Sequence, residues 1–336
     1  MLRLKTVLTA LAFSAAAVTP LLAEDLTIYS HWPRERIEAL VKAFNEVHPE
    51  VNVQYFRSGN AALATIFTTE MEQDVGRADY ITSDVDFMEQ FKDAGYLEAN
   101  RPSSVDELVP EATDPDGYWV PIDFSPYVMV YNTKFVSEAD APKAWKDLLD
   151  PKWKGKIGMA DPRLAGGAQI PIRYWTENLR ERFGEPPFGW DFINKFAAQD
   201  LVLTTGHPQL ADFVVTGEVW IAASIGIANL KTAYENNEPV KIVWPEEGSP
   251  GNIIAAAIVK GAKNHDSAVK MHEFLASIGG QTFLSEVVGH TPSNPKAPFK
   301  APDGRTLDTV KRELVSIPPA MRDENTKKLI AAVEAN

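Results

Sequence analysis

The sequence predicts an α/β fold made of two lobes that are joined by crossover strands. Strand and helix patterns alternate from Leu26 onwards, which is typical of a parallel sheet with helices on its faces. A long apolar stretch from Tyr118 to Asn132 is broken by Pro121 and Pro126, as a strand that passes between two lobes would be. Without its first 23 residues the chain has 313 of its 336 residues, a length that suggests two domains.

The first 23 residues are typical of a secretory signal peptide. Arg3 and Lys5 precede an apolar or small run over 7–18, and Ala23 is a suitable residue for cleavage. The apolar run is shorter than the roughly 20 residues that span a bilayer. We therefore expect residues 1–23 to be removed and the mature protein to be exported to the periplasm.

The composition limits the partners that the mature protein can bind. The formal charge of −13 becomes −15 when Arg3 and Lys5 are lost, which disfavours nucleic acid and anionic membranes. A small anion can still bind, because backbone dipoles attract anions locally. The absence of cysteine excludes thiolate metal sites and a lipid anchor on a processed N-terminal cysteine. We expect a monomer without a metal or another cofactor.

The chain over 26–93 alternates three times between a strand and a helix. The first strand is apolar, and Pro33 then suits the first turn of a helix whose apolar residues recur at helical spacing. The predicted strands are 26–29, 51–55 and 78–82. The predicted helices are 33–47, 61–73 and 85–93.

The pattern beyond the interrupted strand over 118–132 predicts a second lobe and the return to the first. The predicted strands are 157–160, 219–223, 240–244 and 253–259. The predicted helices are 144–149, 170–183, 191–198, 211–216, 267–277 and 280–287, and the tail over 307–333 is expected to be mostly helical. Two Rossmann-like lobes follow, with 24–124 and 250–295 in lobe 1 and 125–249 and 296–336 in lobe 2.

Motifs for catalysis are missing from the sequence. There is no G-x-S-x-G elbow, Walker phosphate loop, H-E-x-x-H or G-x-G-x-x-G, and no two of the six histidines stand at the spacing of metal ligands. We therefore expect a binding protein and not an enzyme. A hydrolase remains an alternative, because catalytic triads are defined by geometry and not by sequence position.

Small polar residues follow each strand of the predicted first lobe. Because ligands bind beyond the carboxyl ends of the strands in an open α/β sheet, these residues are candidates for the ligand site. Free N–H groups of the helices that begin there favour anions. Each residue by itself is better explained as a helix cap, and only the group as a whole, which should share one sheet edge, favours a ligand site. The candidates are Ser30, His31, Ser58, Gly59, Asn60, Ser83 and Asp84.

The second lobe and the crossover supply the other candidates. Gly166 and Gly167 follow the strand 157–160 and would let the backbone approach a ligand. His207 precedes a helix and could contact an oxyanion. Asp123 could receive a cationic group or tether the hinge, and Tyr127 lies near it on the crossover.

Several segments of the chain resemble a known family. They are LTIYS from Leu26, YWVPIDFSPYVMVYNTKFV from Tyr118, WKDLLDPKWKGKIGMADP from Trp145, LTTGHPQLADFVVTGEVWIA from Leu203 and IIAAAIVKGAKNHDSA from Ile253. The chain is similar to the bacterial extracellular solute-binding proteins of ABC importers with the type II periplasmic fold, in the ferric-ion-binding branch. The resemblance implies two lobes that close around a ligand and deliver it to a membrane permease with its ATPase.

The ligand that the resemblance implies depends on two positions. Ferric-binding members carry adjacent tyrosines where this chain has Ile227 and Ala228, which cannot ligate Fe³⁺. Other members bind phosphorylated sugars, vitamin phosphates or phosphonates, so we expect a small organic anion that bears phosphate or phosphonate. Trp32, Tyr127 or Trp220 would stack on its organic part. The alternatives are a ferric ion held by unusual ligands with a helper anion, a polyamine or other cation, and a periplasmic hydrolase on the same scaffold.

Overall fold

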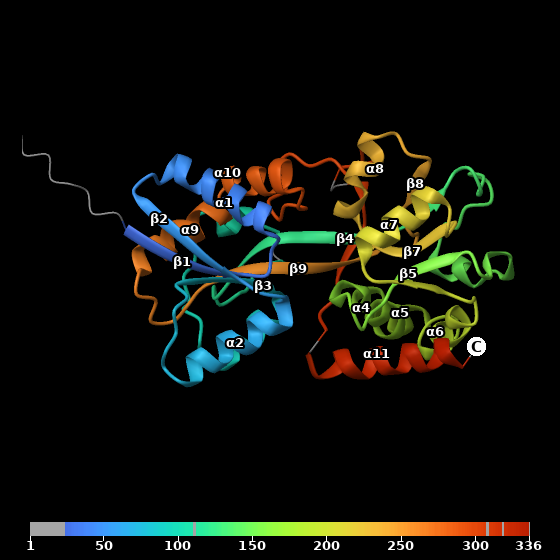
Figure 1. Ribbon diagram of the computed structural model, residues 1–336, viewed down its shortest axis with the longest axis horizontal. Coiled ribbons are helices and arrows are strands. Elements are labelled where there is room, and N and C mark those ends of the chain that lie inside the picture. Colours follow the sequence, from blue (N-terminus) through green and yellow to red (C-terminus); the bar gives the residue numbers. More distant parts are fainter. Residues whose placement is uncertain (1–23, 110–111, 307–308, 318, 336) are drawn as a thin grey trace, which may run out of the picture.

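The computed structural model describes residues 24–109, 112–306, 309–317 and 319–335, so the predicted signal peptide lies outside the described residues. Two α/β lobes lie side by side, and the long strands β4 (Val120–Asn132) and β9 (Ser249–Ile258) run between them (Figure 1). None of the described helices is both long and apolar enough to cross a membrane.

Lobe 1 contains the amino-terminal strands in the order β2-β1-β3-β9-β4. The strands β1 (Glu24–Ser30), β2 (Val51–Arg57) and β3 (Tyr80–Asp84) are parallel, and β9 is antiparallel to β3. The predicted strands of this lobe are therefore confirmed. Its helices are α1 (Arg34–Val47), α2 (Asn60–Glu72), α3 (Val85–Asp93), η1 (Val105–Glu107), α9 (His265–Ala276), α10 (Ile278–Phe283) and the π-helix η8 (Leu284–Val288).

Apolar residues at helical spacing explain how these helices cover the sheet. In α1 the side chains of Ile37, Leu40 and Phe44 are buried in one core cluster with residues of α9. In α2 and α3, residues such as Leu63 and Phe91 are buried in a second cluster. The sheet of lobe 1 thus has a packed core on each face.

Lobe 2 continues the same sheet in the order β4-β7-β5-β6, with β8 paired to the carboxyl-terminal half of β4. Its strands are β5 (Ile157–Ala160), β6 (Val202–Thr204), β7 (Ile221–Gly226) and β8 (Val240–Val243). Its helices are η3 (Trp145–Leu149), η4 (Pro151–Trp153), η5 (Gly166–Ala168), α4 (Gln169–Arg173), η6 (Tyr174–Asn178), α5 (Leu179–Phe183), α6 (Trp190–Ala197), α7 (His207–Thr216), η7 (Ile227–Leu230), α8 (Lys231–Glu235) and α11 (Pro319–Glu334). Trp145 and Trp175 are fully buried in its largest core cluster.

The tail differs from the expected mostly helical segment. The strand β10 (Arg312–Leu314) pairs in parallel with β9, Arg312 opposite Ser249, and the helix α11 begins only at Pro319. The short β6 was also missed by the sequence analysis. Both strands have three residues, and their conformation is fixed by pairing with a neighbour that is distant in sequence.

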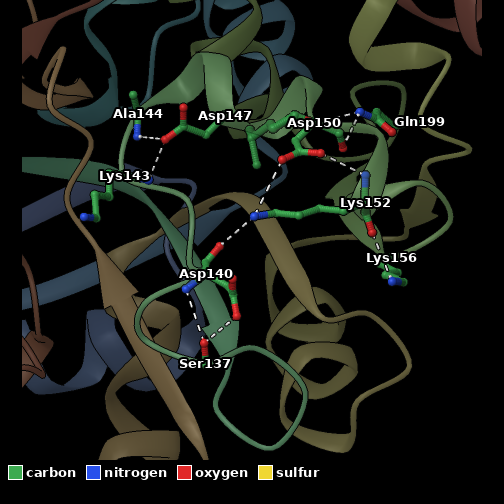
Figure 2. A network of polar contacts seen from close by, with 10 residues as sticks. Ser137, Asp140, Lys143, Ala144, Asp147, Asp150, Lys152, Lys156 and Gln199 are labelled. Atoms are coloured by element: carbon green, nitrogen blue, oxygen red, sulfur yellow. Dashed lines mark hydrogen bonds and ion pairs between the residues drawn. The ribbon is translucent and has the colours of Figure 1, made fainter.

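A polar network fixes the loops at the start of lobe 2 (Figure 2). The Asp147 carboxylate accepts hydrogen bonds from the backbone N–H groups of Lys143 (2.8 Å) and Ala144 (2.9 Å), which caps η3. The Gln199 side-chain amide donates to the carbonyl oxygens of Leu148 and Asp150, both at 3.1 Å. The network is therefore structural, because its donors and acceptors satisfy one another.

The register of β4 locates the junction of the lobes. Residues 120–126 of β4 pair with β9, whereas Tyr127 pairs with Gly226 at the carboxyl end of β7. On the lobe 1 side, Asp84 at the carboxyl end of β3 lies opposite Ile254 of β9, which also pairs with Asp123 of β4. The carboxyl ends of β3 and β7 therefore both border the junction, and the helices α3 and η7 begin directly after them.

Candidate functional site

The first candidates lie at the end of β1. Ser30 is buried, its Oγ lies 2.7 Å from Thr82 Oγ1, and it accepts a hydrogen bond from the Trp32 backbone N–H at 3.2 Å. The His31 Nδ1 lies 3.3 Å from the Thr82 carbonyl oxygen. The two candidates are therefore held by the neighbouring strand β3, and the Ser30 hydroxyl already has partners within the protein.

The candidates near the ends of β2 and β3 contact one another, and Ser83 and Asp84 lie within β3 and not after it as expected. Ser83 is buried and donates from Oγ to Asn60 Oδ1 at 2.6 Å. The backbone N–H of Ser58 donates to the Ser30 carbonyl oxygen at 3.3 Å, which links the ends of β2 and β1. Gly59 is exposed directly before α2, and a Cβ at this position would meet nothing within 4 Å. The structure thus brings the lobe 1 candidates together at one edge of the sheet.

Two arginines near His31 were missed by the sequence analysis, which considered only small polar residues and histidines at the strand ends. Arg57 is the last residue of β2, and its Nε donates to the Trp32 carbonyl oxygen at 2.7 Å. Arg36 Nη1 lies 3.1 Å from Nε2 of the buried His290. Burial lowers the pKa of His31, Asp84 partly offsets this, and the charges of Arg36 and Arg57 lower it further. His31 is therefore neutral at pH 7, with one carboxylate and two arginines nearby.

Asp123 acts as a tether within the hinge. Its buried carboxylate accepts hydrogen bonds from the Thr291 backbone N–H at 2.9 Å and from Ser125 Oγ at 2.8 and 2.9 Å. These contacts join β4 to the segment that follows η8. Of its two expected roles, the geometry matches the tether.

Tyr127, Gly167 and His207 form the lobe 2 group. The rings of Tyr127 and His207 meet edge to face with their centroids 5.4 Å apart. A Cβ on Gly167 would overlap the Tyr127 hydroxyl oxygen and lie 3.1 Å from His207 Nε2, so a larger residue would have to displace the Tyr127 ring. Gly166 lies next to Gly167 in η5. The structure thus unites residues from β4, η5 and the start of α7.

His207 has an unusual state for a histidine at a helix start. Both ring nitrogens are shielded from solvent and have no hydrogen-bond partner. Burial lowers its pKa from 6.5 to about 4, so the ring is neutral at pH 7 and carries one N–H donor and one acceptor. An unsatisfied buried polar group costs about 1–3 kcal/mol. The ring is therefore prepared to bind a polar partner.

A cavity of about 910 Å³ lies between the lobes, and none of the candidate residues described above is among those that line it. Lobe 2 contributes η7 and the start of α8, directly after Gly226, and lobe 1 contributes residues around η8 that flank His290. Its charged residues are Lys231, Glu286, Lys300 and Arg312. The cavity is thus bordered by three cations and one anion in a chain of net charge −13.

Two positions of the cavity lining offer no side-chain atom that could ligate a metal ion. Ile227 and Ala228 line the cavity and offer only carbon from their side chains. Among the described residues, no group of three or more histidines or carboxylates is placed to hold a metal ion. Trp32 is buried against His290, and Trp220 stacks on Phe135, so these two rings pack within the protein.

Comparisons with known proteins agree with this architecture. A family model described as "Bacterial extracellular solute-binding protein" matches residues 78–316. The chain is 27% identical to the "Major ferric iron-binding protein" of Neisseria meningitidis serogroup A, with 85% of each chain covered. It is 26% identical to a "Putative 2-aminoethylphosphonate-binding periplasmic protein" of Salmonella typhimurium, with 82% of this chain and 81% of the relative covered.

A solved structure supports the fold. The periplasmic binding protein AfuA from Actinobacillus pleuropneumoniae, with fructose-6-phosphate bound, superposes with a TM-score of 0.72 at 23% identity, covering 93% of this chain and 99% of that chain. The predicted type II fold is thereby confirmed. The chain therefore belongs to the bacterial extracellular solute-binding protein family, as a periplasmic-type solute-binding protein of ABC importers.

Proposed function

We propose that the mature chain captures a small organic anion bearing phosphate or phosphonate between its two lobes in the periplasm and delivers it, without chemical change, to an ABC permease and its ATPase. The observation that carries this proposal is the lobe 2 group, in which a neutral His207 with two unpartnered ring nitrogens lies beside Gly167 and Tyr127. A phosphate or phosphonate oxygen would accept from the ring N–H.

The strand ends and arginines of lobe 1 also favour an anionic ligand. The edge formed by His31, Asn60 and Ser83 lies at the carboxyl ends of parallel strands, where helices begin. Arg36 and Arg57 add positive charge there. A ligand held between this edge and the lobe 2 group would favour the closed arrangement of the lobes, because only that arrangement completes its contacts.

The relatives are consistent with more than one ligand. The ferric iron-binding relative keeps iron as an alternative, and the 2-aminoethylphosphonate-binding relative favours a phosphonate. The side chains of Ile227 and Ala228 and the absence of a metal-binding group among the described residues argue against iron. We therefore rank the organic anion first.

Isothermal titration calorimetry with 2-aminoethylphosphonate, phosphonoacetate, glucose 6-phosphate, spermidine and ferric citrate tests the proposal. We expect binding to at least one of the phosphate or phosphonate compounds and no visible charge-transfer band with iron. Binding of ferric ion or spermidine alone would contradict the proposal. Turnover of 4-nitrophenyl phosphate would favour the hydrolase instead.

Substitution of His207 tests the site. His207→Ala removes the unpartnered ring, so we expect the Kd of the bound compound to rise about tenfold or more, equivalent to about 1.4 kcal/mol. Ser58→Ala should weaken binding less, and neither variant should unfold the protein. His265→Ala is the matched control, because His265 is half-exposed and paired with Glu98 on lobe 1. Unchanged affinity in both site variants would remove this assignment.

A further inference from the structure

Arg312 is a charged residue of the interlobe cavity that contacts the crossover strand β4. It begins β10, which pairs with β9 at Ser249, on the segment that leads from lobe 1 to α11 of lobe 2. Its Nη1 donates to the Phe124 carbonyl oxygen of β4 at 3.0 Å, and its guanidinium carbon lies 4.5 Å from the centroid of the Phe124 ring. Arg312 therefore touches one crossover strand and pairs with the other.

The guanidinium of Arg312 has unused donors. It carries five N–H groups, and one of them is occupied by Phe124. None of the described carboxylates forms an ion pair with it, since Asp123 is bonded to Thr291 and Ser125. Burial lowers the pKa of Arg312 to about 10, an effect that Asp123 only partly offsets. Arg312 is partly exposed, so the N–H groups that Phe124 does not occupy are accessible to a ligand in the cavity.

The surroundings of Arg312 in the cavity fit an organic anion. Ser293 lines the cavity, and its fully buried Oγ has no hydrogen-bond partner. Lys231 and Lys300 add positive charge, Glu286 is the opposing carboxylate, and Phe299 offers an apolar surface. A volume of about 910 Å³ far exceeds the space that a single ion requires and lies in the range of organic ligand sites, roughly 300–1,000 Å³.

We propose that Arg312 is an anion-binding residue of the interlobe cavity, which receives a carboxylate, phosphate or phosphonate group of the ligand through its free N–H groups. Ser293 Oγ donates to the same group. An arginine suits this role because its planar fork binds two oxygens at once. For its organic ligand this inference rests on the proposed function, and it adds a contact in the interlobe cavity, whose lining does not include the lobe 2 group.

The position of Arg312 gives anion binding a consequence for the hinge. An anion held by Arg312 and by Lys231 of α8 would connect the β10–β4 contact to lobe 2. Because a ligand shifts a conformational balance only by its preference for one state, this bridge would favour the arrangement in which the cavity is formed. Arg312 therefore couples ligand charge to lobe closure.

Arg312→Gln in the mature chain tests the inference. With the compound that binds the wild-type protein by calorimetry, we expect the Kd to rise at least tenfold. Arg305→Gln is the matched control, because Arg305 is an exposed arginine on the same segment and bonds Asp303, and it should bind like the wild type. Equal affinity in Arg312→Gln and the wild type would overturn the inference while leaving the proposed function intact.

Two further measurements test the role of Arg312 if no compound binds the wild type or if Arg312→Gln does not fold. If no organic compound binds the wild type, the proposed function fails, and millimolar sulfate against chloride at equal ionic strength becomes the probe. A sulfate-dependent rise in Tm that is lost in Arg312→Gln supports the anion site, and the same response in both proteins, or none in either, overturns it.

If Arg312→Gln does not fold, Arg312→Lys is the second variant, because lysine keeps the positive charge but cannot bind two oxygens at once as the planar guanidinium does. Weaker binding by folded Arg312→Lys supports the inference, and wild-type affinity overturns it.

Discussion

The protonation state of the buried histidines is set by burial more than by nearby charge in this protein. His207, His272 and His290 all have a lowered pKa whose main cause is burial. His272 is structural, because its Nδ1 lies 2.9 Å from the Tyr80 hydroxyl and its Nε2 lies 3.0 Å from the Asn100 carbonyl oxygen. His207 has no such partners. Both ring nitrogens of His272 have hydrogen-bond partners, as expected of a core residue. Neither ring nitrogen of His207 has one, which makes His207 a candidate for contact with a ligand.

His272 makes the stability of the protein depend on pH. Its pKa falls from 6.5 to about 4 on folding, so below pH 6.5 the unfolded chain binds a proton that the folded chain does not. Stability should therefore decrease as the pH falls from 6.5 to 4, by about 3 kcal/mol in total from this residue. Urea unfolding at several pH values should show a shallower decrease for His272→Gln than for the wild type.

His265 supplies a control of opposite sign. Its pKa is raised, chiefly by the hydrogen bond with Glu98, so its contribution to stability is present below the unfolded pKa and is lost as the pH rises. His265→Gln should therefore steepen the acid-side decrease. An unchanged slope in His272→Gln would show that His272 is not the neutral buried group described here.

At the scale of elements, much of the fold could be predicted from the sequence. The strand patterns at 26–29 and 51–55 are local, and the two prolines within 118–132 mark the crossover β4 correctly. The three-residue strands β6 and β10 could not be predicted, because their pairing partners are distant in sequence. The boundaries of the lobes at 124/125, 249/250 and 295/296 stay a prediction.

The candidate site could be predicted only in part, because some of its residues are brought together by contacts between segments that are distant in sequence. Small polar residues at strand ends indicated the edge of lobe 1, and Gly167 and His207 indicated that of lobe 2. Arg36 and Arg312 carry no such signal, since the first lies within a helix and the second on a segment expected to be helical. Their placement at His290 and Phe124 arises from tertiary packing.

The hinge element β4 should depend on Asp123. Asp123→Asn keeps the shape of the side chain but loses the charge that strengthens its bonds to Thr291 and Ser125, so we expect the free energy of unfolding to fall by about 1–3 kcal/mol. Denaturant unfolding measures this change. Asp106→Asn is the control, because Asp106 is exposed on lobe 1. A loss no larger than that of the control would mean that the tether does not stabilise the hinge.

At the scale of the whole molecule, two lobes with separate cores are connected by few segments. Each core cluster draws its residues from one lobe, whereas the interlobe cavity draws on both. Relative motion of the lobes is the ordinary expectation for such an architecture. A ligand that fills the cavity would therefore change the distance between the lobes more than the structure of either.

A measured distance between the lobes tests this account most directly. The chain has no cysteine, so Ala62→Cys on α2 and Asp212→Cys on α7, both exposed, accept spin labels at two unique positions. Pulsed electron paramagnetic resonance should give a shorter and narrower distance distribution when the phosphate or phosphonate compound identified by calorimetry is added. An identical distribution with and without a compound that binds would contradict capture between two closing lobes.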